Sequence, residues 1–341
     1  MSSIEFGCLP TMIGSMPHSD VTGACTIMRH YLSDIPTWPQ LPKRDFRENM
    51  YVQFSEGFPG IRLENDRIFV DTSQDLNPSL EKLYTAYLEN APENYAISAD
   101  YAAGFYACLA AVGHKQDVTK GQVTGPVSWG LTITDSNRRS VIYDEVLADA
   151  VARLLHLKAA WQEKELKKVA RETIIFLDEP YMASFGSAFV TLSKEKVINL
   201  INETLGGISG IKGVHCCGNT DWSVILATST DILSFDTYNY ADSLTLYPAE
   251  VSKFLGEKGA IAWGIVPNNK DLLKKESASS LKDRLEEAMA PFTRDGFPFR
   301  QLLRQSLLTP SCGLDPLVEE EVAYALETLV ALSTHIRTKY L

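Results

Sequence analysis

Most of the sequence alternates short apolar runs with longer amphipathic stretches, a pattern typical of βα units. From residue 122 onward the alternation occurs six times. The expected strands lie at 122–126, 173–177, 213–217, 232–236, 260–266 and 305–310. The expected helices lie at 143–171, 193–205, 221–227, 249–255, 270–290 and 317–337. Repeated βα units in one domain favour a parallel sheet, because each helix returns the chain to the same end of the sheet.

Two earlier segments extend the pattern. We expect one strand at 11–15 and another in the region 36–54, which brings the number of strands to eight. Eight βα units predict an α/β fold with a single (β/α)8 TIM barrel over residues 1–341. The segment 61–70 alternates around a polar centre and predicts a small inserted hairpin, placed to cover part of the barrel mouth. No Gly/Ser-rich or Pro-rich linker divides the sequence, which supports one domain.

The composition excludes several classes of protein. The formal net charge is -11, from 32 basic and 43 acidic residues, and no basic cluster with interleaved aromatics occurs, which argues against a nucleic-acid partner. No apolar run approaches the roughly 20 residues of a membrane span. The first residues lack a signal-peptide pattern, so we expect a cytoplasmic protein. Six cysteines are too sparse for a disulfide scaffold, and we interpret Cys25 and Cys108 as core residues.

Polar residues follow many of the expected strands. The active site of a (β/α)8 barrel lies at the C-terminal ends of its strands, so these residues should converge. The converging residues are Gly14, Ser15, Gly125, Pro126, Asp178, Glu179, His215, Cys217, Asp236 and Cys312.

Three of these residues predict a zinc site. His215 and Cys217 are two residues apart, so on an extended strand end their side chains point the same way. Cys312 ends another strand between Pro310 and Gly313, where a structural residue would be larger and apolar. Zinc prefers four ligands from Cys, His and carboxylate, and a catalytic zinc keeps one exchangeable position. Asp236 could take that position, or it could be a helix N-cap.

A zinc ion with two thiolate ligands suits alkyl transfer to sulfur. Such a metal activates water poorly, but it lowers the pKa of a bound thiol so that a thiolate persists at neutral pH. The nucleophile would be the thiolate of a small-molecule substrate.

Asp178 and Glu179 end an apolar strand, and Pro180 keeps Glu179 extended. One carboxylate could bind a substrate ammonium while the other orients a ligand or a loop. The alternative is one capping acid and one surface acid. Small residues at 11–15 and 123–126 let backbone groups approach a ligand closely.

These motifs, in this order, resemble the catalytic C-terminal barrel of cobalamin-independent methionine synthase. Its superfamily also holds uroporphyrinogen decarboxylase and corrinoid-dependent thiol methyltransferases. The motifs that carry the resemblance are Thr11-Met12-Ile13-Gly14-Ser15, Thr124-Gly125-Pro126, Leu177-Asp178-Glu179-Pro180, His215-Cys216-Cys217, Asp236 and Ser311-Cys312-Gly313-Leu314.

The resemblance implies a Zn²⁺ enzyme that methylates homocysteine to methionine. It implies that the backbone of Ile13, Gly14 and Ser15 contacts the amino-acid substrate and that Asp178 holds its ammonium. His215, Cys217 and Cys312 stand at the positions of zinc ligands, and Asp236 stands where the family has a ligating Glu. We therefore assign Asp178 and Asp236 as catalytic residues, with Glu179 as a further substrate-binding residue.

The sequence also departs from the family. Full-length members carry a second barrel that helps hold a folate donor, and this chain has the length of one barrel. The shorter relatives imply a methylcorrinoid donor presented by a corrinoid protein. The family has a Gly-Glu pair in its second-strand region, and we find no equivalent Glu, so another thiol such as coenzyme M is an alternative acceptor. The family's His after the seventh strand is replaced by Trp263-Gly264-Ile265-Val266-Pro267. A non-catalytic module that binds zinc or a corrinoid partner is a second alternative.

Overall fold

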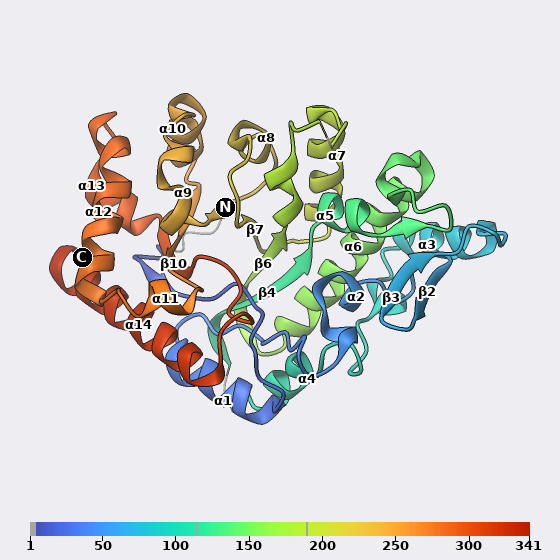
Figure 1. The fold of residues 1–341 in the computed structure, drawn as a ribbon, viewed down its shortest axis with the longest axis horizontal. Helices are drawn as coiled ribbons and strands as arrows, with labels where there is room; N and C mark the ends of the chain where they lie inside the picture. Colours follow the sequence, from blue (N-terminus) through green and yellow to red (C-terminus); the bar gives the residue numbers. More distant parts are fainter. Residues whose placement is uncertain (1–4, 114, 189) are drawn as a thin grey trace.

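The computed structural model describes residues 5–113, 115–188 and 190–341. Within these residues, seven parallel strands form one curled sheet in the order β1-β10-β9-β8-β7-β6-β4 (Figure 1). The strands are β1 (Leu9–Pro10), β4 (Gln116–Thr124), β6 (Ala170–Asp178), β7 (Ile211–Cys216), β8 (Ile232–Phe235), β9 (Ala260–Val266) and β10 (Ser306–Pro310). The predicted α/β class and its repeated parallel strands are confirmed.

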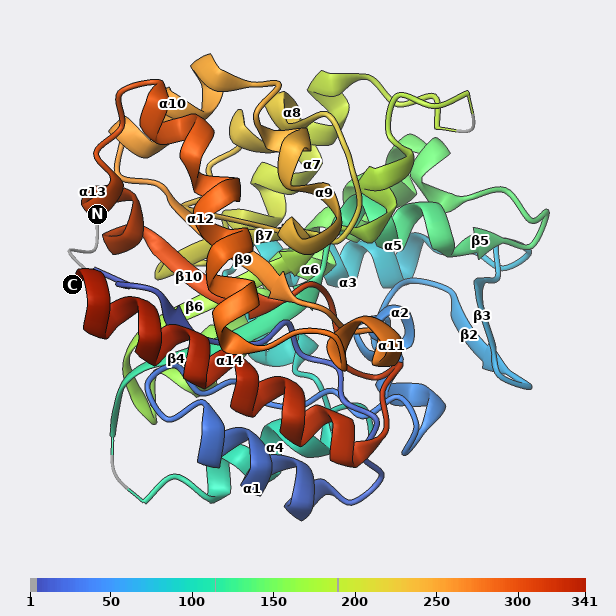
Figure 2. The same ribbon diagram turned by 60° about the vertical axis from the view of Figure 1, so that its left-hand side comes forward.

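Helices surround the sheet, and Figure 2 shows the strands in the centre of the molecule. The larger helices are α1 (Val21–Tyr31), α3 (Asn77–Leu88), α4 (Ala103–Ala110), α6 (Glu145–Leu166), α7 (Lys194–Leu205), α9 (Thr237–Leu244), α10 (Pro248–Gly256), α12 (Ala278–Arg294) and α14 (Glu319–Tyr340). Shorter ones are α2 (Met50–Gln53), α5 (Pro126–Thr132), α8 (Trp222–Leu226), α11 (Lys270–Leu273) and α13 (Phe299–Arg304). No helix in the described part of the chain has the length and apolarity needed to cross a membrane.

The eighth predicted strand is replaced by an irregular segment at residues 36–40. This segment makes isolated parallel bridges to both edges of the sheet, through Thr37 to Lys120 of β4 and through Gln40 to Ser15 beyond β1. Pro36 and Pro39 lack an N–H, so this segment cannot form a regular ladder of backbone hydrogen bonds. Within the described residues, the curled sheet thus has seven strands and one bridging segment where eight regular strands were predicted.

A glutamine side chain completes the seam between this segment and β4. Gln162 of α6 accepts a hydrogen bond from the backbone N–H of Gln122 and donates one to its carbonyl, both at 3.0 Å. Its Oε1 also accepts from the indole N–H of Trp38 at 3.1 Å. These bonds satisfy buried backbone groups that a strand partner would otherwise satisfy.

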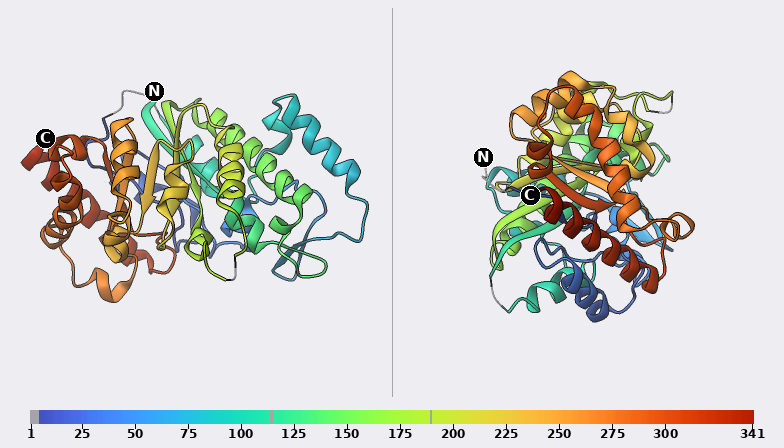
Figure 3. Two further views of the ribbon diagram at one scale, coloured as in Figure 1. Left: turned by 90° about the horizontal axis from the view of Figure 1, so that it is seen from above. Right: turned by 90° about the vertical axis from the view of Figure 1, so that its left-hand side faces the viewer.

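The predicted hairpin is present as β2 (Ile61–Glu64) and β3 (Arg67–Val70), which pair antiparallel. Asn65 and Asp66 between them have φ values of 48° and 58°, as expected where both central residues of a tight hairpin turn have positive φ. β3 also pairs with the short β5 (Thr134–Asp135). Figure 3 shows the hairpin and α3 at one end of the molecule, away from the C-terminal helix.

Two apolar clusters hold the fold together. The larger cluster lies between the sheet and the helices. The smaller one includes Ile174, Phe176, Ile211 and Ile232, which lie two or four residues before polar residues on the same strands. Because side chains alternate along a strand, these apolar residues share the inner face of the curled sheet with Asp178 and His215. The candidate site therefore stands on a packed apolar layer.

Candidate metal centre and its cavity

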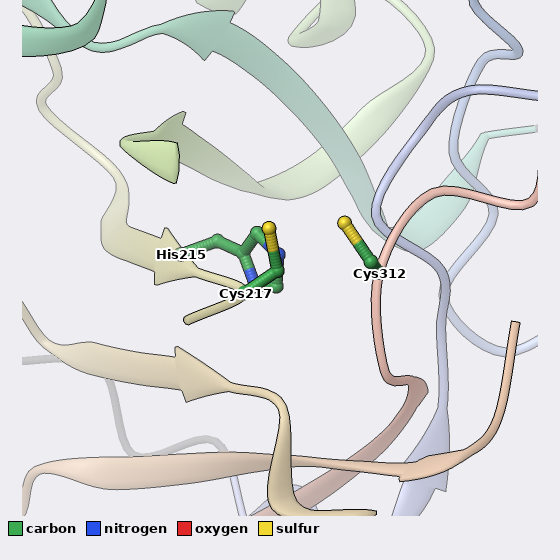
Figure 4. Close-up of side chains that lie close together, drawn as sticks. All are labelled: His215, Cys217 and Cys312. Atoms are coloured by element: carbon green, nitrogen blue, oxygen red, sulfur yellow. The ribbon is translucent and has the colours of Figure 1, made fainter. Parts of the chain in front are cut away.

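His215, Cys217 and Cys312 lie together at the C-terminal edge of the sheet. Their ligand atoms are all within 4.8 Å of one another. Figure 4 shows His215 and Cys217 at one strand end and Cys312 on a separate segment, with both sulfur atoms in the space between them. The sequence predicted this convergence, because β7 and β10 belong to one parallel sheet and end on the same side.

The His215 side chain is oriented as a metal ligand would be. Its Nδ1 lies 2.9 Å from the hydroxyl oxygen of Ser234 on the adjacent strand β8. Its Nε2 is buried and has no hydrogen-bond partner among the described residues. A ligating histidine commonly donates its second ring N–H to a nearby oxygen, which fixes the tautomer and leaves the other nitrogen free for the metal. Ser234 is in position to accept that hydrogen bond.

The two thiols influence each other's pKa. A hydrogen bond from the Cys312 thiol, helped by His215, lowers the pKa of Cys217 to about 4. The same hydrogen bond and burial raise the pKa of Cys312. A thiolate beside a thiol and an unpaired imidazole nitrogen is a donor set of two sulfurs and one nitrogen. That set fits Zn²⁺, which binds Cys and His at about 2.3 and 2.0 Å with tetrahedral geometry.

Cys312 is fixed by contacts on both sides of its short segment. On one side, Ser311 N–H donates to the Val266 carbonyl at 2.8 Å. On the other, the Gly313 carbonyl accepts from the Asn268 side chain at 2.9 Å. A side chain at Gly313 would clash with the Ser15 hydroxyl, so only glycine allows this close approach.

A cavity of about 200 Å³ opens beside the three candidate ligands. The residues that line it are Ile13, Ser15, Gln40, Pro42, Glu48, Asn49, Met50, Tyr51, Asp178, Pro180, His215, Cys217, Cys312, Gly313 and Asp315. Three of them are acidic and none is Lys or Arg. The wall of the cavity therefore favours a cationic group over an anionic one.

Asp178 lines the cavity, where the sequence predicted a carboxylate. Its side chain is buried, yet Oδ1 has no hydrogen-bond partner among the described residues. Burial raises the pKa of Asp178 to about 6, while His215 and Lys120 act in the opposite direction. At neutral pH the carboxylate is largely ionised and has an unused acceptor at the cavity.

Lys120 is a residue that the sequence analysis missed. It is fully buried on β4, where its Nζ donates to the Ile13 carbonyl at 2.8 Å and lies 4.5 Å from the Phe176 ring centroid. Burial lowers the pKa of Lys120 to about 8, and Asp178 raises it. A buried cation beneath Asp178 is suited to stabilise its ionised form. The available signal was the alternation of Lys120, Gln122 and Thr124, which places all three on one face of the strand.

Glu179 does not line the cavity. Its Oε1 accepts from Val127 N–H at 2.9 Å, and its Oε2 accepts from the N–H and hydroxyl of Ser128 at 2.7 and 2.6 Å. Burial raises the pKa of Glu179 to about 7, and these hydrogen bonds lower it. The carboxylate therefore caps the N-terminus of α5, which is the capping role that the sequence left open. Its role in substrate binding stays a prediction.

Asp236 occupies the N-cap of α9. Its Oδ1 accepts from the backbone N–H of Asn239 at 2.9 Å, and its Oδ2 accepts from the Asn239 side chain at 2.7 Å. It is not part of the group of three candidate ligands. The position matches the second of the two predicted roles, the helix cap.

Only some residues of the first predicted strand segment, residues 11–15, line the cavity. Ile13 and Ser15 line it, whereas a side chain on Gly14 would meet Gln40 and Gln122 inside the sheet. Gly14 therefore permits the close packing of the bridging segment, with its carbonyl accepting from Gln40 N–H at 3.0 Å.

The region 36–54 supplies cavity residues that the sequence analysis did not assign. Gln40, Glu48 and Tyr51 all line the cavity. Glu48 is buried and accepts from Leu41 N–H at 3.1 Å and from Arg44 at 2.8 Å. Its position depends on the irregular path of residues 36–48, which contains Pro36, Pro39 and Pro42 and which no periodic pattern predicts. The hairpin 61–70, by contrast, contributes no residue to the cavity wall.

No family model matches the sequence, and no curated protein matches it. In fold, the chain is similar to a B12-independent methionine synthase from Shewanella sp. W3-18-1, solved in complex with selenomethionine. The TM-score is 0.60 and the identity 16%, over 97% of this chain and 98% of that one. It is also similar to a methyltransferase from Methanosarcina mazei, with a TM-score of 0.58 and 13% identity over 98% of this chain and 93% of that one. The resemblance to cobalamin-independent methionine synthase is thus confirmed at the level of the fold.

Proposed function

We propose that this protein is a zinc-dependent methyltransferase that transfers a methyl group to a thiol, with homocysteine as acceptor and methionine as product. The observation that carries the proposal is the group formed by His215, Cys217 and Cys312, whose ligand atoms lie within 4.8 Å of one another beside a cavity. The fold neighbours named as a methionine synthase and a methyltransferase support the same class of reaction. The proposal includes a single barrel over residues 1–341, closed by the segment 36–40.

In this proposal His215, Cys217 and Cys312 hold the zinc. When bound, zinc lowers the pKa of a substrate thiol and presents it as a thiolate nucleophile. Ser234 keeps the His215 imidazole in the tautomer that leaves Nε2 free, at an Nδ1–Oγ distance of 2.9 Å. Asp236, as the cap of α9, borders the site without a proposed bond to the metal.

The charges around the cavity favour an acceptor that carries an ammonium group. Glu48, Asp178 and Asp315 line the cavity, and no lysine or arginine lines it. Homocysteine offers an ammonium that Asp178 Oδ1 can accept, whereas coenzyme M carries a sulfonate that these acids repel. We therefore propose homocysteine over coenzyme M.

The proposed methyl donor is a methylcorrinoid, and a corrinoid protein is the proposed partner that presents it. The sequence basis is the resemblance to the shorter relatives, which implies a methylcorrinoid donor. The cavity of about 200 Å³ has room for the amino-acid acceptor and is too small to enclose a corrinoid, so the donor would approach from outside.

The test is a methylation assay on the zinc-loaded protein with homocysteine or coenzyme M as acceptor. Methylcobalamin serves as one donor, and iodomethane as a second donor that needs no binding site. We expect methionine to form with homocysteine, more slowly with Cys217→Ser and at the wild-type rate with the neighbouring Cys216→Ser. Bound zinc without acceleration from either donor would instead indicate the non-catalytic module.

A further inference from the structure

Cys25 of α1 and Cys108 of α4 place their sulfur atoms 2.6 Å apart. This separation is about 0.5 Å longer than the roughly 2.05 Å of a disulfide bond. The two residues are 83 positions apart in the sequence and lie on helices that run beside each other, as Figures 1 and 2 show. They are far from the candidate zinc ligands in sequence, and Cys108 lines a different cavity.

The helices that carry the pair are held close together. Cys25 Sγ also contacts the Gly104 carbonyl at 3.6 Å. Gly104 itself lies against the Pro39 backbone, where a side chain would clash. Arg29 of α1 donates to the carbonyl of Ala111 at 2.6 Å, which is a second tie between the helices. These contacts hold α1 and α4 close together at the cysteine pair.

One member of the pair is reachable from outside. Cys108 is only partly buried, and it lines an apolar cavity of about 220 Å³ together with Met28 and Arg29. A hydrogen bond from the Cys108 thiol and the nearby Arg29 guanidinium lower the pKa of Cys25, although burial opposes them. Thiolate character together with an access route is what makes a cysteine pair susceptible to oxidation.

We propose that Cys25 and Cys108 are an oxidation site that forms an intrachain disulfide. With hydrogen peroxide as oxidant, one thiol attacks an oxygen atom, forms a sulfenic acid and releases one water. The second thiol attacks that sulfur, forms the S–S bond and releases a second water. Two thiols lose two electrons and two protons, and one peroxide is reduced to two waters. This inference does not depend on the proposed methyltransferase function.

The disulfide would stabilise the irregular part of the sheet, which is the bridging segment 36–40. The cavity beside Cys108 is also lined by Pro36, Thr37 and Trp38, the first residues of the bridging segment. The cross-link would enclose the segment 36–40 and the hairpin 61–70 in one covalent loop. Closing a loop of this length lowers the unfolding equilibrium constant by on the order of a thousandfold in the chain-entropy account.

The experiment treats the full, zinc-loaded chain with one equivalent of hydrogen peroxide, followed by alkylation and peptide mapping without reductant. We expect one cross-linked peptide that contains Cys25 and Cys108, lighter by two hydrogen atoms and separated by reductant. Cys8 is the internal control, because it is a buried thiol that contacts the Leu303 carbonyl at 3.5 Å, and it should stay reduced.

Each outcome of this experiment leads to a different conclusion. A cross-linked peptide together with a higher midpoint of thermal unfolding, absent in Cys25→Ser and in Cys108→Ser, supports the proposal. Either cysteine recovered as a sulfinic acid, or both recovered as free thiols, overturns it. A disulfide found only between Cys217 and Cys312 would also overturn it, since that pair belongs to the candidate metal centre.

Discussion

Ser234 Oγ lies 2.9 Å from Nδ1 of His215, across the parallel pair formed by β8 and β7. The two residues are direct partners in the strand register, so the hydroxyl reaches the imidazole with no help from a loop. A hydrogen bond donated by Nδ1 to Ser234 would leave Nε2 as the unprotonated nitrogen that a metal can bind.

Ser234→Ala should therefore weaken zinc binding. Loss of such an outer partner typically costs 10–100-fold in metal affinity. The measurement is competition for zinc against a chromogenic chelator. Ser306→Ala is the matched control, since Ser306 is also a buried strand serine but lies at the opposite end of the sheet and bonds to Trp263 and Leu302. Equal affinities for zinc in wild type and both variants would show that Ser234 does not support zinc binding.

Gly313→Ala should displace Cys312 and weaken zinc binding. Its new Cβ would meet the Ser15 hydroxyl, which is itself held by Asp315 at 2.6 Å. Adding Ser15→Ala to this variant should restore affinity, because the obstructing oxygen is gone. The control is Gly256→Ala at the end of α10, where no atom lies within 4 Å of the added carbon. The measurement is a zinc titration of the three variants. If Ser15→Ala did not restore the zinc affinity of Gly313→Ala, the steric explanation would be contradicted.

Asp178→Asn should raise the KM for homocysteine by roughly ten- to a hundredfold, the range expected when a hydrogen bond to a charged group is lost. The KM for coenzyme M should rise no more than slightly, because that thiol has no ammonium. Steady-state methylation with each thiol gives both values. Asp231→Asn, at the far end of β8 where the carboxylate accepts from Lys212 N–H, serves as control. An equal rise for both thiols would argue against ammonium binding by Asp178.

In the metal-free protein, the carboxyl groups of Asp178 and Glu179 should each lower the stability as the pH rises from about 4 to about 7, while the Cys217 thiol, whose pKa is lowered to about 4, acts in the opposite direction. Burial raises the pKa of Asp178 from 3.8 to about 6 and that of Glu179 from 4.5 to about 7. The unfolded chain loses these protons at lower pH than the folded protein, so stability is full below the unfolded values and is lost as the pH passes through the folded ones.

Asp178→Asn should flatten this pH dependence between about pH 4 and pH 6. The difference of roughly two pKa units corresponds to on the order of 3 kcal/mol in the unfolding free energy. Urea unfolding of wild type and variant at several pH values measures it. Parallel curves for the two proteins would show that the Asp178 carboxyl is not the group responsible.

The sequence predicted that His215, Cys217 and Cys312 lie together, because strand geometry and the parallel sheet determine their positions. The spacing of His215 and Cys217 fixes their common direction on a strand, and parallel strands bring Cys312 to the same edge. Glu179 and Asp236 were harder to assign. Asp236 follows a strand and caps the helix that comes next, whereas Glu179 caps α5 of the neighbouring βα unit, a contact that depends on how the two units pack.

The bridging segment and the cavity wall could not be predicted in detail. The path of residues 36–40 depends on Gln162 from a distant helix, which replaces the missing ladder partner of Gln122. The same holds for Lys120, whose burial beneath Asp178 depends on the closure of that seam. The approach of Cys25 to Cys108 depends on how α1 packs on α4, and helical apolar patterns predicted only that both are interior.

Zinc-edge X-ray absorption on the reconstituted protein, without and with homocysteine, tests the central claim most directly because it counts the sulfur ligands of the metal. The account predicts two sulfurs at about 2.3 Å, from Cys217 and Cys312, and a third when homocysteine is added. Cys217→Ser should lose one sulfur and Cys216→Ser should lose none. A protein that takes up no zinc, or a zinc whose sulfur count is the same with and without homocysteine, would contradict the account.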